Sequence, residues 1–304
     1  MRPWKFRGYL PLVIVMGVAI SGMGAYGKPK ANADNKEEKS TVDAVLFLAP
    51  LDDLVNLAAG TLEARVSLDY SFDDTLRPAG SRCQPFNFLR IYRSDGLMYG
   101  AEEMEPVFSI YMNQVRGAHS LFFENRHYYG VRKSDPSQRF SSAAISGDKE
   151  KGPWLLAGEW HAMAVTWVVD KEGLQVELYL DGKSQSRRSF PIKEGGVGSF
   201  KKGDFLSVGG ETLSAATLLS YRLSNRVRTK EEIASDKPLV ADDATTLFMD
   251  AGIAEKTAAL KRSEFASMVK NKKLNIRQPV FVGEFKIIDT PKGKAIQFYK
   301  QKSR

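Results

Sequence analysis

The sequence predicts an all-β fold, a sandwich of two antiparallel sheets with at most one or two short helices. From residue 60 onward, short segments alternate apolar and polar residues, which is the pattern of a strand with one buried face. Turns rich in Gly, Asn, Asp and Pro separate these segments. Few stretches have the apolar spacing of a helix. With 304 residues, of which 43% are hydrophobic and 26% charged, the chain can bury a large core in one or two domains.

The first predicted strand runs from Thr61 to Tyr70. Leu62, Ala64, Val66 and Leu68 alternate with polar residues, so we expect one buried and one solvated face. In the next strand, Phe86 to Arg93, we place Phe86, Phe88 and Arg90 on one side and Leu89 and Ile91 on the other. Three shorter candidates follow within residues 107–113, 120–123 and 128–131.

The segment from residue 158 to residue 183 gives the clearest signal. Trp160 to Trp167 is apolar on both faces, which predicts a central strand covered on both sides. Leu174 to Leu180 then alternates, and Asp181-Gly182 fits a type I′ hairpin turn because both positions need a positive φ. These two strands should be antiparallel neighbours. Phe205 to Val208 and Ala216 to Leu223 add two more strands.

Four motifs occur in order between residues 158 and 233. They are Gly158-Glu159-Trp160-His161 with Ala164-Val165-Thr166, Leu178 to Lys183, Leu206 to Gly210, and Tyr221 to Ser224 followed by Arg228 to Ile233. Together they resemble the laminin-G-like jelly roll of the concanavalin A-like lectin/glucanase superfamily, over roughly residues 60 to 236. The resemblance implies a jelly-roll sandwich, but function depends on sites that differ between members of one fold.

The C-terminal part resembles the same family a second time. Thr245 to Asp250, Gly283 to Phe285 and Gly293 to Phe298 look like the strands that usually open such a domain. Because two isolated strands cannot bury their apolar faces, we expect them to pair with the preceding sandwich. A truncated second domain is the alternative. The predicted organisation is a signal at residues 1–27, a polar linker at 28–42, the sandwich at 43–240, and a basic segment at 241–304 that completes it.

The N-terminus has the pattern of an export signal. Arg2, Lys5 and Arg7 precede an uncharged run from Gly8 to Gly27, and small residues follow near residues 25–27 and 31–33. The mature protein would then begin near residue 28 or 34. The uncharged run is also close to the roughly 20 residues that span a bilayer, so an uncleaved membrane anchor is the alternative.

The charge is unevenly distributed, although the whole chain carries a net charge of +8. Residues 256–304 hold 13 Lys and Arg against Glu264, Glu284 and Asp289, whereas residues 28–255 are net acidic. We expect the basic tail to dock on its own acidic body, and an exported protein should not meet nucleic acid. The single cysteine, Cys83, excludes an intrachain disulfide.

No catalytic residues are assigned from the sequence. Glucanases of this superfamily need two carboxylates that point into one cleft, and Glu103 and Glu105 have that spacing but fall in a predicted loop. We expect His161 to be packed and hydrogen-bonded. Calcium is conceivable at the acidic turn Asp73-Asp74, which we interpret as a simple turn, so no cofactor is predicted.

The ligand-binding candidates are Tyr99, which lies in a turn, and Trp154, which follows Gly152-Pro153. Exposed aromatic rings suit the apolar C–H faces of sugars. The sequence therefore predicts an exported, non-catalytic recognition module for a glycan or an extracellular protein. One alternative is a cell-envelope assembly subunit whose basic tail binds an acidic partner. The other is a divergent glycoside hydrolase or lyase.

Overall fold

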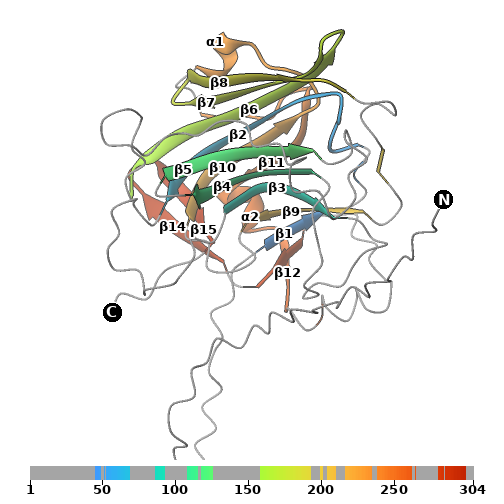
Figure 1. Cartoon of the computed structure of the whole chain (residues 1–304). Helices are drawn as coiled ribbons and strands as arrows, with labels where there is room; N and C mark the ends of the chain where they lie inside the picture. The colour runs from blue at the N-terminus through green and yellow to red at the C-terminus, as the bar shows by residue number, and fades with distance from the viewer. Residues whose placement is uncertain are drawn as a thin grey trace, which may run out of the picture. The chain divides into compact units, whose positions relative to one another are not determined.

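We describe the protein from a computed structural model, which divides into residues 1–40 and 41–304. The description covers residues 45–48, 51, 53–68, 86–92, 108–115, 118–125, 158–192, 199–200, 204–209, 216–234, 238–261, 264, 280–283 and 285–298. These residues form two sheets and two one-turn helices, α1 (Lys230–Ile233) and α2 (Ala251–Ala254). The all-β prediction, with at most two short helices, is confirmed for this part of the chain (Figure 1).

The two sheets are built from antiparallel strand pairs, except for one parallel pair at an edge. The seven-stranded sheet has the order β12 (Ala258–Leu260), β13 (Val280–Val282), β1 (Val45–Leu48), β9 (Phe205–Gly209), β3 (Phe86–Tyr92), β4 (Phe108–Val115) and β5 (Ala118–Asn125). The eight-stranded sheet has the order β14 (Lys286–Thr290), β15 (Gly293–Gln297), β10 (Ala216–Ser224), β2 (Ala59–Leu68), β6 (Trp160–Asp170), β7 (Gly173–Leu180) and β8 (Lys183–Phe190), and β11 (Thr245–Asp250) also pairs with β10.

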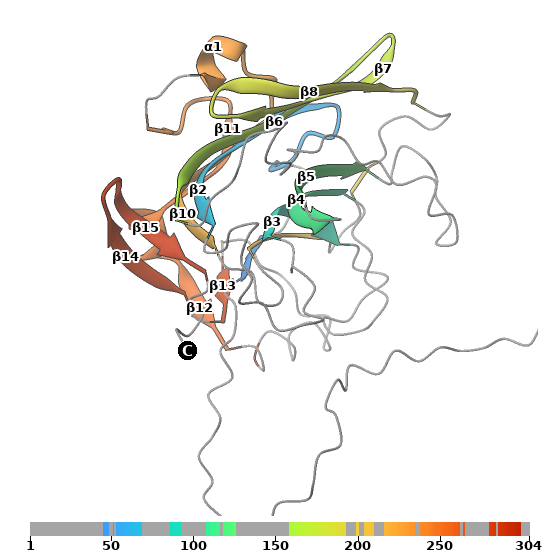
Figure 2. The same ribbon diagram turned by 60° about the vertical axis from the view of Figure 1, so that its left-hand side comes forward.

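The main core lies between the two sheets, which Figure 2 shows as two layers. The ring of Trp167 on β6 lies 5.6 Å from the ring of Phe108 on β4, measured between centroids, and 6.1 Å from that of Phe123 on β5. Near the C-terminal end, Phe298 lies 5.6 Å from Phe86 on β3. These contacts between aromatic rings join the sheets into one sandwich.

β6 is a central strand, as predicted, because it lies between β2 and β7. One of its faces sends Met163, Val165 and Trp167 into the main core. On its other face, Ala164 packs against Tyr179 and Ile233 of α1. The predicted hairpin turn is also confirmed, since φ is 50° at Asp181 and 73° at Gly182.

The prediction that one face of β2 is solvated is wrong at Thr61, Glu63 and Ser67, all of which are buried. The Nε atom of Arg222 donates a hydrogen bond of 2.8 Å to Oε2 of Glu63. The Nε atom of Arg228 lies 3.2 Å from the same oxygen. The alternation of residues identified this face correctly but could not show that a later segment, carrying Arg228, covers it.

The predicted sidedness of β3 is also wrong. Phe86, Phe88, Leu89 and Ile91 all belong to the main core. The reason is an irregularity in the pairing of β3 with β4, which lies between Asn87 and Leu89. An extra residue at such a bulge changes which face each later side chain occupies.

The C-terminal strands join both sheets, since β13 pairs with β1 of the seven-stranded sheet and β11, β14 and β15 belong to the eight-stranded sheet. Leu247 and Met249 of β11 lie opposite Leu223 and Tyr221 of β10, and β15 pairs with residues 217–218 of the same strand. β14 pairs in turn with β15. No helix within the described ranges is long and apolar enough to cross a membrane, and the predicted signal at residues 1–27 lies outside those ranges.

Candidate functional site

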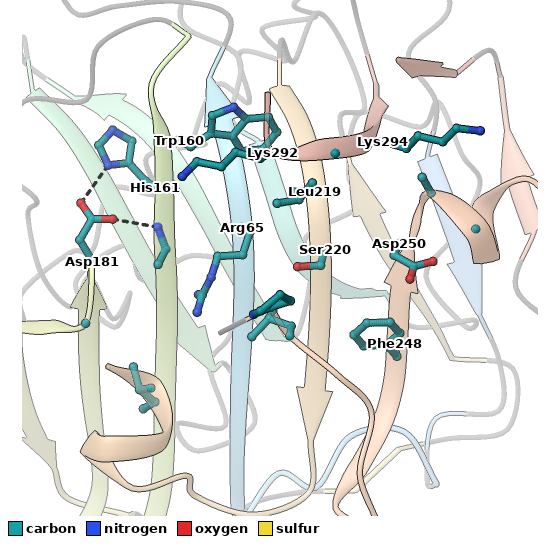
Figure 3. A pocket seen from close by; sticks show the side chains of 18 of the residues that line it. Arg65, Trp160, His161, Asp181, Leu219, Ser220, Phe248, Asp250, Lys292 and Lys294 are labelled. Carbon is teal, nitrogen blue, oxygen red and sulfur yellow. Dashed lines mark hydrogen bonds and ion pairs between the residues drawn. The ribbon is translucent and has the colours of Figure 1, made fainter. Parts of the chain in front are cut away.

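A cleft of about 790 Å³ lies on the outer face of the eight-stranded sheet. Its floor is a row of four residues that lie directly opposite one another across β6, β2, β10 and β11. They are Ala162, Arg65, Ser220 and Asp250. Directly opposite residues point to the same face of a sheet, and Figure 3 shows Arg65, Ser220 and Asp250 on neighbouring strands. The row therefore brings together residues that lie as far apart in the sequence as Arg65 and Asp250.

Segments that follow the strands form the walls of the cleft. They are the Asp181-Gly182 turn, residues 233–234 at the end of α1, residues 238–239, residues 251–252 of α2, and the turn that joins β14 to β15. Gly182 lies close to α1, because a Cβ atom added there would come within 2.8 Å of the Cα atom of Ala234. The Asp181-Gly182 turn and the end of α1 are thus packed against each other.

His161 and Asp181 form a hydrogen-bonded pair at one end of the cleft (Figure 3). Nδ1 of His161 lies 3.0 Å from Oδ2 of Asp181, and the N–H of Ala162 donates a bond of 2.9 Å to Oδ1. His161 is only 9% exposed, and its Nε2 atom has no hydrogen-bond partner among the described residues. His161 is therefore packed and hydrogen-bonded, as the sequence predicted.

The pKa of the Asp181 carboxyl is set by opposing effects. Burial alone would raise this pKa, but the hydrogen bonds from His161 and Ala162, together with the charges of His161 and Arg65, lower it below its ordinary value. Asp181 is accordingly an ionised acceptor near neutral pH. Because both of its oxygens already accept hydrogen bonds, Asp181 mainly joins the hairpin turn to β6.

The second carboxylate of the cleft is also used by the fold. Oδ1 of Asp250 accepts a hydrogen bond of 2.9 Å from the N–H of Ile253 and thereby caps α2.

The cations of the β14–β15 turn are more available to a ligand than these carboxylates. Lys292 is exposed, and Nζ of Lys294 lies 3.3 Å from Glu255 in a surface pair whose side chains are 62% and 47% exposed. Such exposed pairs are weak, so a ligand can compete for Lys294.

Two half-buried aromatic residues, Trp160 and Phe248, also line the cleft. The site thus combines aromatic rings with cationic and hydrogen-bonding groups. Within the described ranges, no three His, Cys, Asp or Glu side chains group together as metal ligands. This arrangement can bind and orient a polar ligand that has an apolar face.

The sequence-predicted ligand residues Tyr99 and Trp154 lie outside the described residues. The same is true of Glu103 and Glu105, and of the Asp73-Asp74 turn considered for calcium. Sequence reasoning missed Arg65, Asp250 and Lys292. Arg65 and Asp250 stand in predicted strands, but only the register between strands shows that they share a face.

Neither a scan against models of protein families nor a search of curated proteins found a match. A search of solved structures found a heptameric SAP-like pentraxin from Limulus polyphemus, at 11% identity and a TM-score of 0.41, over 65% of this chain and 76% of that chain. It also found a putative carbohydrate-binding protein from Bacteroides ovatus, at 12% identity and a TM-score of 0.36, over 69% of this chain and 52% of that one. An alginate lyase from Pseudomonas aeruginosa matches at 11% identity and a TM-score of 0.32, over 56% of this chain and 65% of that one.

The last two matches span less than two thirds of the matched chains. All three TM-scores are below 0.5, so these likenesses carry no argument about what this chain binds or does. The two-sheet antiparallel sandwich rests instead on the strand pairings and ring contacts of the chain itself.

Proposed function

We propose that the protein is an exported, non-catalytic recognition module that binds a glycan in the cleft of the eight-stranded sheet. The observation that carries this proposal is the combination of Trp160 with the polar row Arg65–Ser220–Asp250 in one cleft. Sugar rings present apolar C–H faces to aromatic side chains and hydroxyl groups to polar ones. The volume of about 790 Å³ also falls within the usual range for ligand sites, roughly 300–1,000 Å³.

The charges of the cleft favour a glycan that carries acidic groups. Asp181 and Asp250 both have oxygens committed to hydrogen bonds within the fold. Lys292 is exposed beside the cleft, and Lys294 forms an exposed surface pair with Glu255. These two lysines are therefore more available to a ligand than the carboxylates.

A glycan array, followed by titration of the glycans that bind, tests this function. Trp160→Ala should weaken binding at least tenfold, because the aromatic platform is lost, and Trp160→Phe should restore part of it. Lys292→Ala should weaken binding of acidic glycans more than that of neutral ones, and the effect should shrink as salt is raised. Lys171→Ala, which removes an exposed cation from the turn between β6 and β7, is the matched control.

The proposal fails if no glycan binds or if Trp160→Ala binds as tightly as the wild type. The predicted ligand residues Tyr99 and Trp154 stay candidates, and Tyr99→Ala and Trp154→Ala belong in the same titration. Salt-sensitive binding to acidic polymers of any kind, without dependence on Trp160, would instead favour the cell-envelope assembly role. Release of reducing ends from a bound glycan would favour the divergent hydrolase.

Export is part of the proposal and has its own test. The uncharged run from Gly8 to Gly27 after three basic residues supports a cleaved signal. N-terminal sequencing of the protein recovered outside the cytoplasm should find a start near residue 28 or 34. Recovery from the membrane with Met1 still present would favour the anchor.

A further inference from the structure

The cleft on the eight-stranded sheet lies where β10 changes its pairing partner. On one edge of β10, residues 220–224 pair with β11, whereas residues 217–218 pair with β15. β11 ends at Asp250, where α2 begins, and the hairpin turn before β15 carries Lys292. Both residues line the cleft. The end of one strand and the approach to another therefore each contribute a charged side chain to the same cleft.

Leu219 lies at this change of partner and gives the cleft an apolar floor. The pairing of β10 with β2 is irregular between Leu218 and Ser220, so Leu219 is an extra residue in the strand. Leu218 belongs to the main core, whereas Leu219 is half-buried and lines the cleft. Bulges often re-aim a side chain in this way next to a functional site. Figure 3 shows Leu219 between Trp160 and Phe248, so apolar side chains follow the length of the cleft.

Lys292 supplies a free positive charge at the β6 end of the cleft. Its backbone N–H donates to Oγ1 of Thr290, but its exposed ammonium group has no hydrogen-bond or ion-pair partner within the described part of the chain. Figure 3 shows its side chain extending toward Trp160 and His161. Both oxygens of Asp181, the carboxylate at this end, already accept hydrogen bonds. The β6 end therefore offers a ligand a cation without a competing carboxylate oxygen.

Asp250 supplies the opposite group at the β11 end. Its Oδ1 atom caps α2, but its Oδ2 atom accepts no hydrogen bond from any described residue. Nζ of Lys294 lies 3.3 Å from Oε1 of Glu255, so these two charges offset each other near α2. The β11 end thus offers a carboxylate oxygen that needs a hydrogen-bond donor, and its negative charge disfavours a second acidic group there.

We propose that the cleft binds a glycan in which one acidic sugar is followed by neutral sugars. This inference rests on the glycan-binding function proposed above and gives the ligand a direction. The carboxylate lies beside Lys292 at the Trp160 end, and hydroxyl groups of a neutral sugar donate to Oδ2 of Asp250. Because β2 and β10 lie between β6 and β11, the two ends are about 14 Å apart, which is more than one sugar ring can bridge.

Calorimetric titration of the full chain with three trisaccharides tests this direction. Glucuronosyl-xylobiose carries one acid at its end, xylotriose carries none, and trigalacturonate carries an acid on every sugar. At neutral pH and constant ionic strength, we expect glucuronosyl-xylobiose to bind at least tenfold more tightly than either of the others. Xylotriose lacks the group that pairs with Lys292, and trigalacturonate places a carboxylate beside Asp250.

Two variants separate the ends of the cleft. Lys292→Gln should remove the advantage of glucuronosyl-xylobiose over xylotriose, because the cation is lost. Asp250→Asn keeps an oxygen that can cap α2, since Asn caps helices as well as Asp does, but it removes the negative charge. This variant should bind trigalacturonate at least fivefold more tightly than wild type does, a gain that a damaged fold could not produce. Asp243→Asn removes an exposed carboxylate that does not line the cleft, and this matched control should bind like wild type.

The inference is overturned if glucuronosyl-xylobiose fails to bind, or if trigalacturonate binds wild type at least as tightly. It is also overturned if Asp250→Asn leaves the affinities for all the trisaccharides unchanged. None of these results removes the glycan-binding function, provided that some glycan on the array binds and loses affinity in Trp160→Ala. If no glycan binds, the function itself fails and this inference falls with it.

Discussion

At the scale of single residues, Trp167 packs directly against the backbone of Gly60. A Cβ atom added to Gly60 would come within 2.1 Å of the Trp167 ring. That ring cannot easily move, because its Nε1 donates a hydrogen bond of 2.9 Å to the carbonyl oxygen of Asn56, and it also contacts Phe108. The close approach of β2 to this ring requires a residue without a side chain.

Gly60→Ala should therefore destabilise the protein by about 1–3 kcal/mol or more, the usual cost of overpacking a core. Urea denaturation followed by the fluorescence of tryptophan measures this loss. Gly252→Ala is the control, since its added Cβ would meet only an oxygen of Asp250 at an ordinary 3.5 Å. Equal midpoints for the two variants would show that Trp167 has room to shift.

At the scale of elements, a buried ion-pair network ties β2 to β10 and to the segment that crosses them. Glu63 on β2 is fully buried and contacts Arg222 on β10 and Arg228 beyond the end of β10. Arg228 in turn makes two hydrogen bonds with the Asp242 carboxylate, of 2.8 and 2.7 Å. Glu63 thus pairs with Arg222, which is 8% exposed, and shares Arg228, which is 2% exposed, with Asp242 and Glu232.

Glu63→Gln should cost about 3–5 kcal/mol, because it removes the carboxylate that pairs with the buried Arg222 guanidinium, while Arg228 keeps its pairs with Asp242 and Glu232. Chemical denaturation at neutral pH measures the change in the free energy of unfolding. Glu172→Gln, in the exposed turn between β6 and β7, is the matched control and should change stability by less than about 0.5 kcal/mol. A loss in Glu63→Gln no larger than in the control would contradict the role of the network.

The same elements show what the sequence could and could not predict. The turn at Asp181-Gly182 and the central position of β6 were predictable, because local turn chemistry and a strand that is apolar on both faces require them. The burial of Glu63 was not, because its partner Arg222 is 159 residues away in the sequence. The bulge in β3 was missed because either face of a regular strand over residues 86–91 carries two apolar residues and one polar residue, Arg90 or Asn87. Alternation alone therefore could not show that the register changes between Asn87 and Leu89.

At the scale of the whole molecule, the cleft arises from strand order rather than from a motif. Ala162, Arg65, Ser220 and Asp250 form one row only because β6, β2, β10 and β11 lie side by side. The alternating pattern predicted most of these strands but says nothing of which ones are neighbours across the sheet. The predicted ligand residues Tyr99 and Trp154 were chosen from local context alone, and they remain predictions.

The segment carrying Arg226, Arg228, Glu232 and Asp242 should also make the stability of the molecule sensitive to acid. Hydrogen bonding to Arg226 lowers the pKa of Glu232 to about 2 from an ordinary value of 4.5. Hydrogen bonding to Arg228 likewise holds the pKa of Asp242 well below its ordinary value. A carboxyl whose pKa is lower in the folded state contributes stability above its unfolded pKa, and loses it as the pH falls toward the folded one.

The contribution of these two carboxyls to the free energy of unfolding should therefore be constant above about pH 5 and fall between about pH 5 and pH 2. Urea denaturation across this range measures the slope. The double variant Glu232→Gln with Asp242→Asn should be less stable than wild type at pH 7 and show a flatter dependence on pH, because two of the titrating groups are gone. Asp289→Asn, which changes an exposed side chain of β14, serves as control and should run parallel to wild type. If the double variant also runs parallel to wild type, the acid sensitivity must arise from other carboxylates, and the pairs with Arg226 and Arg228 contribute little to holding this segment on the sheet.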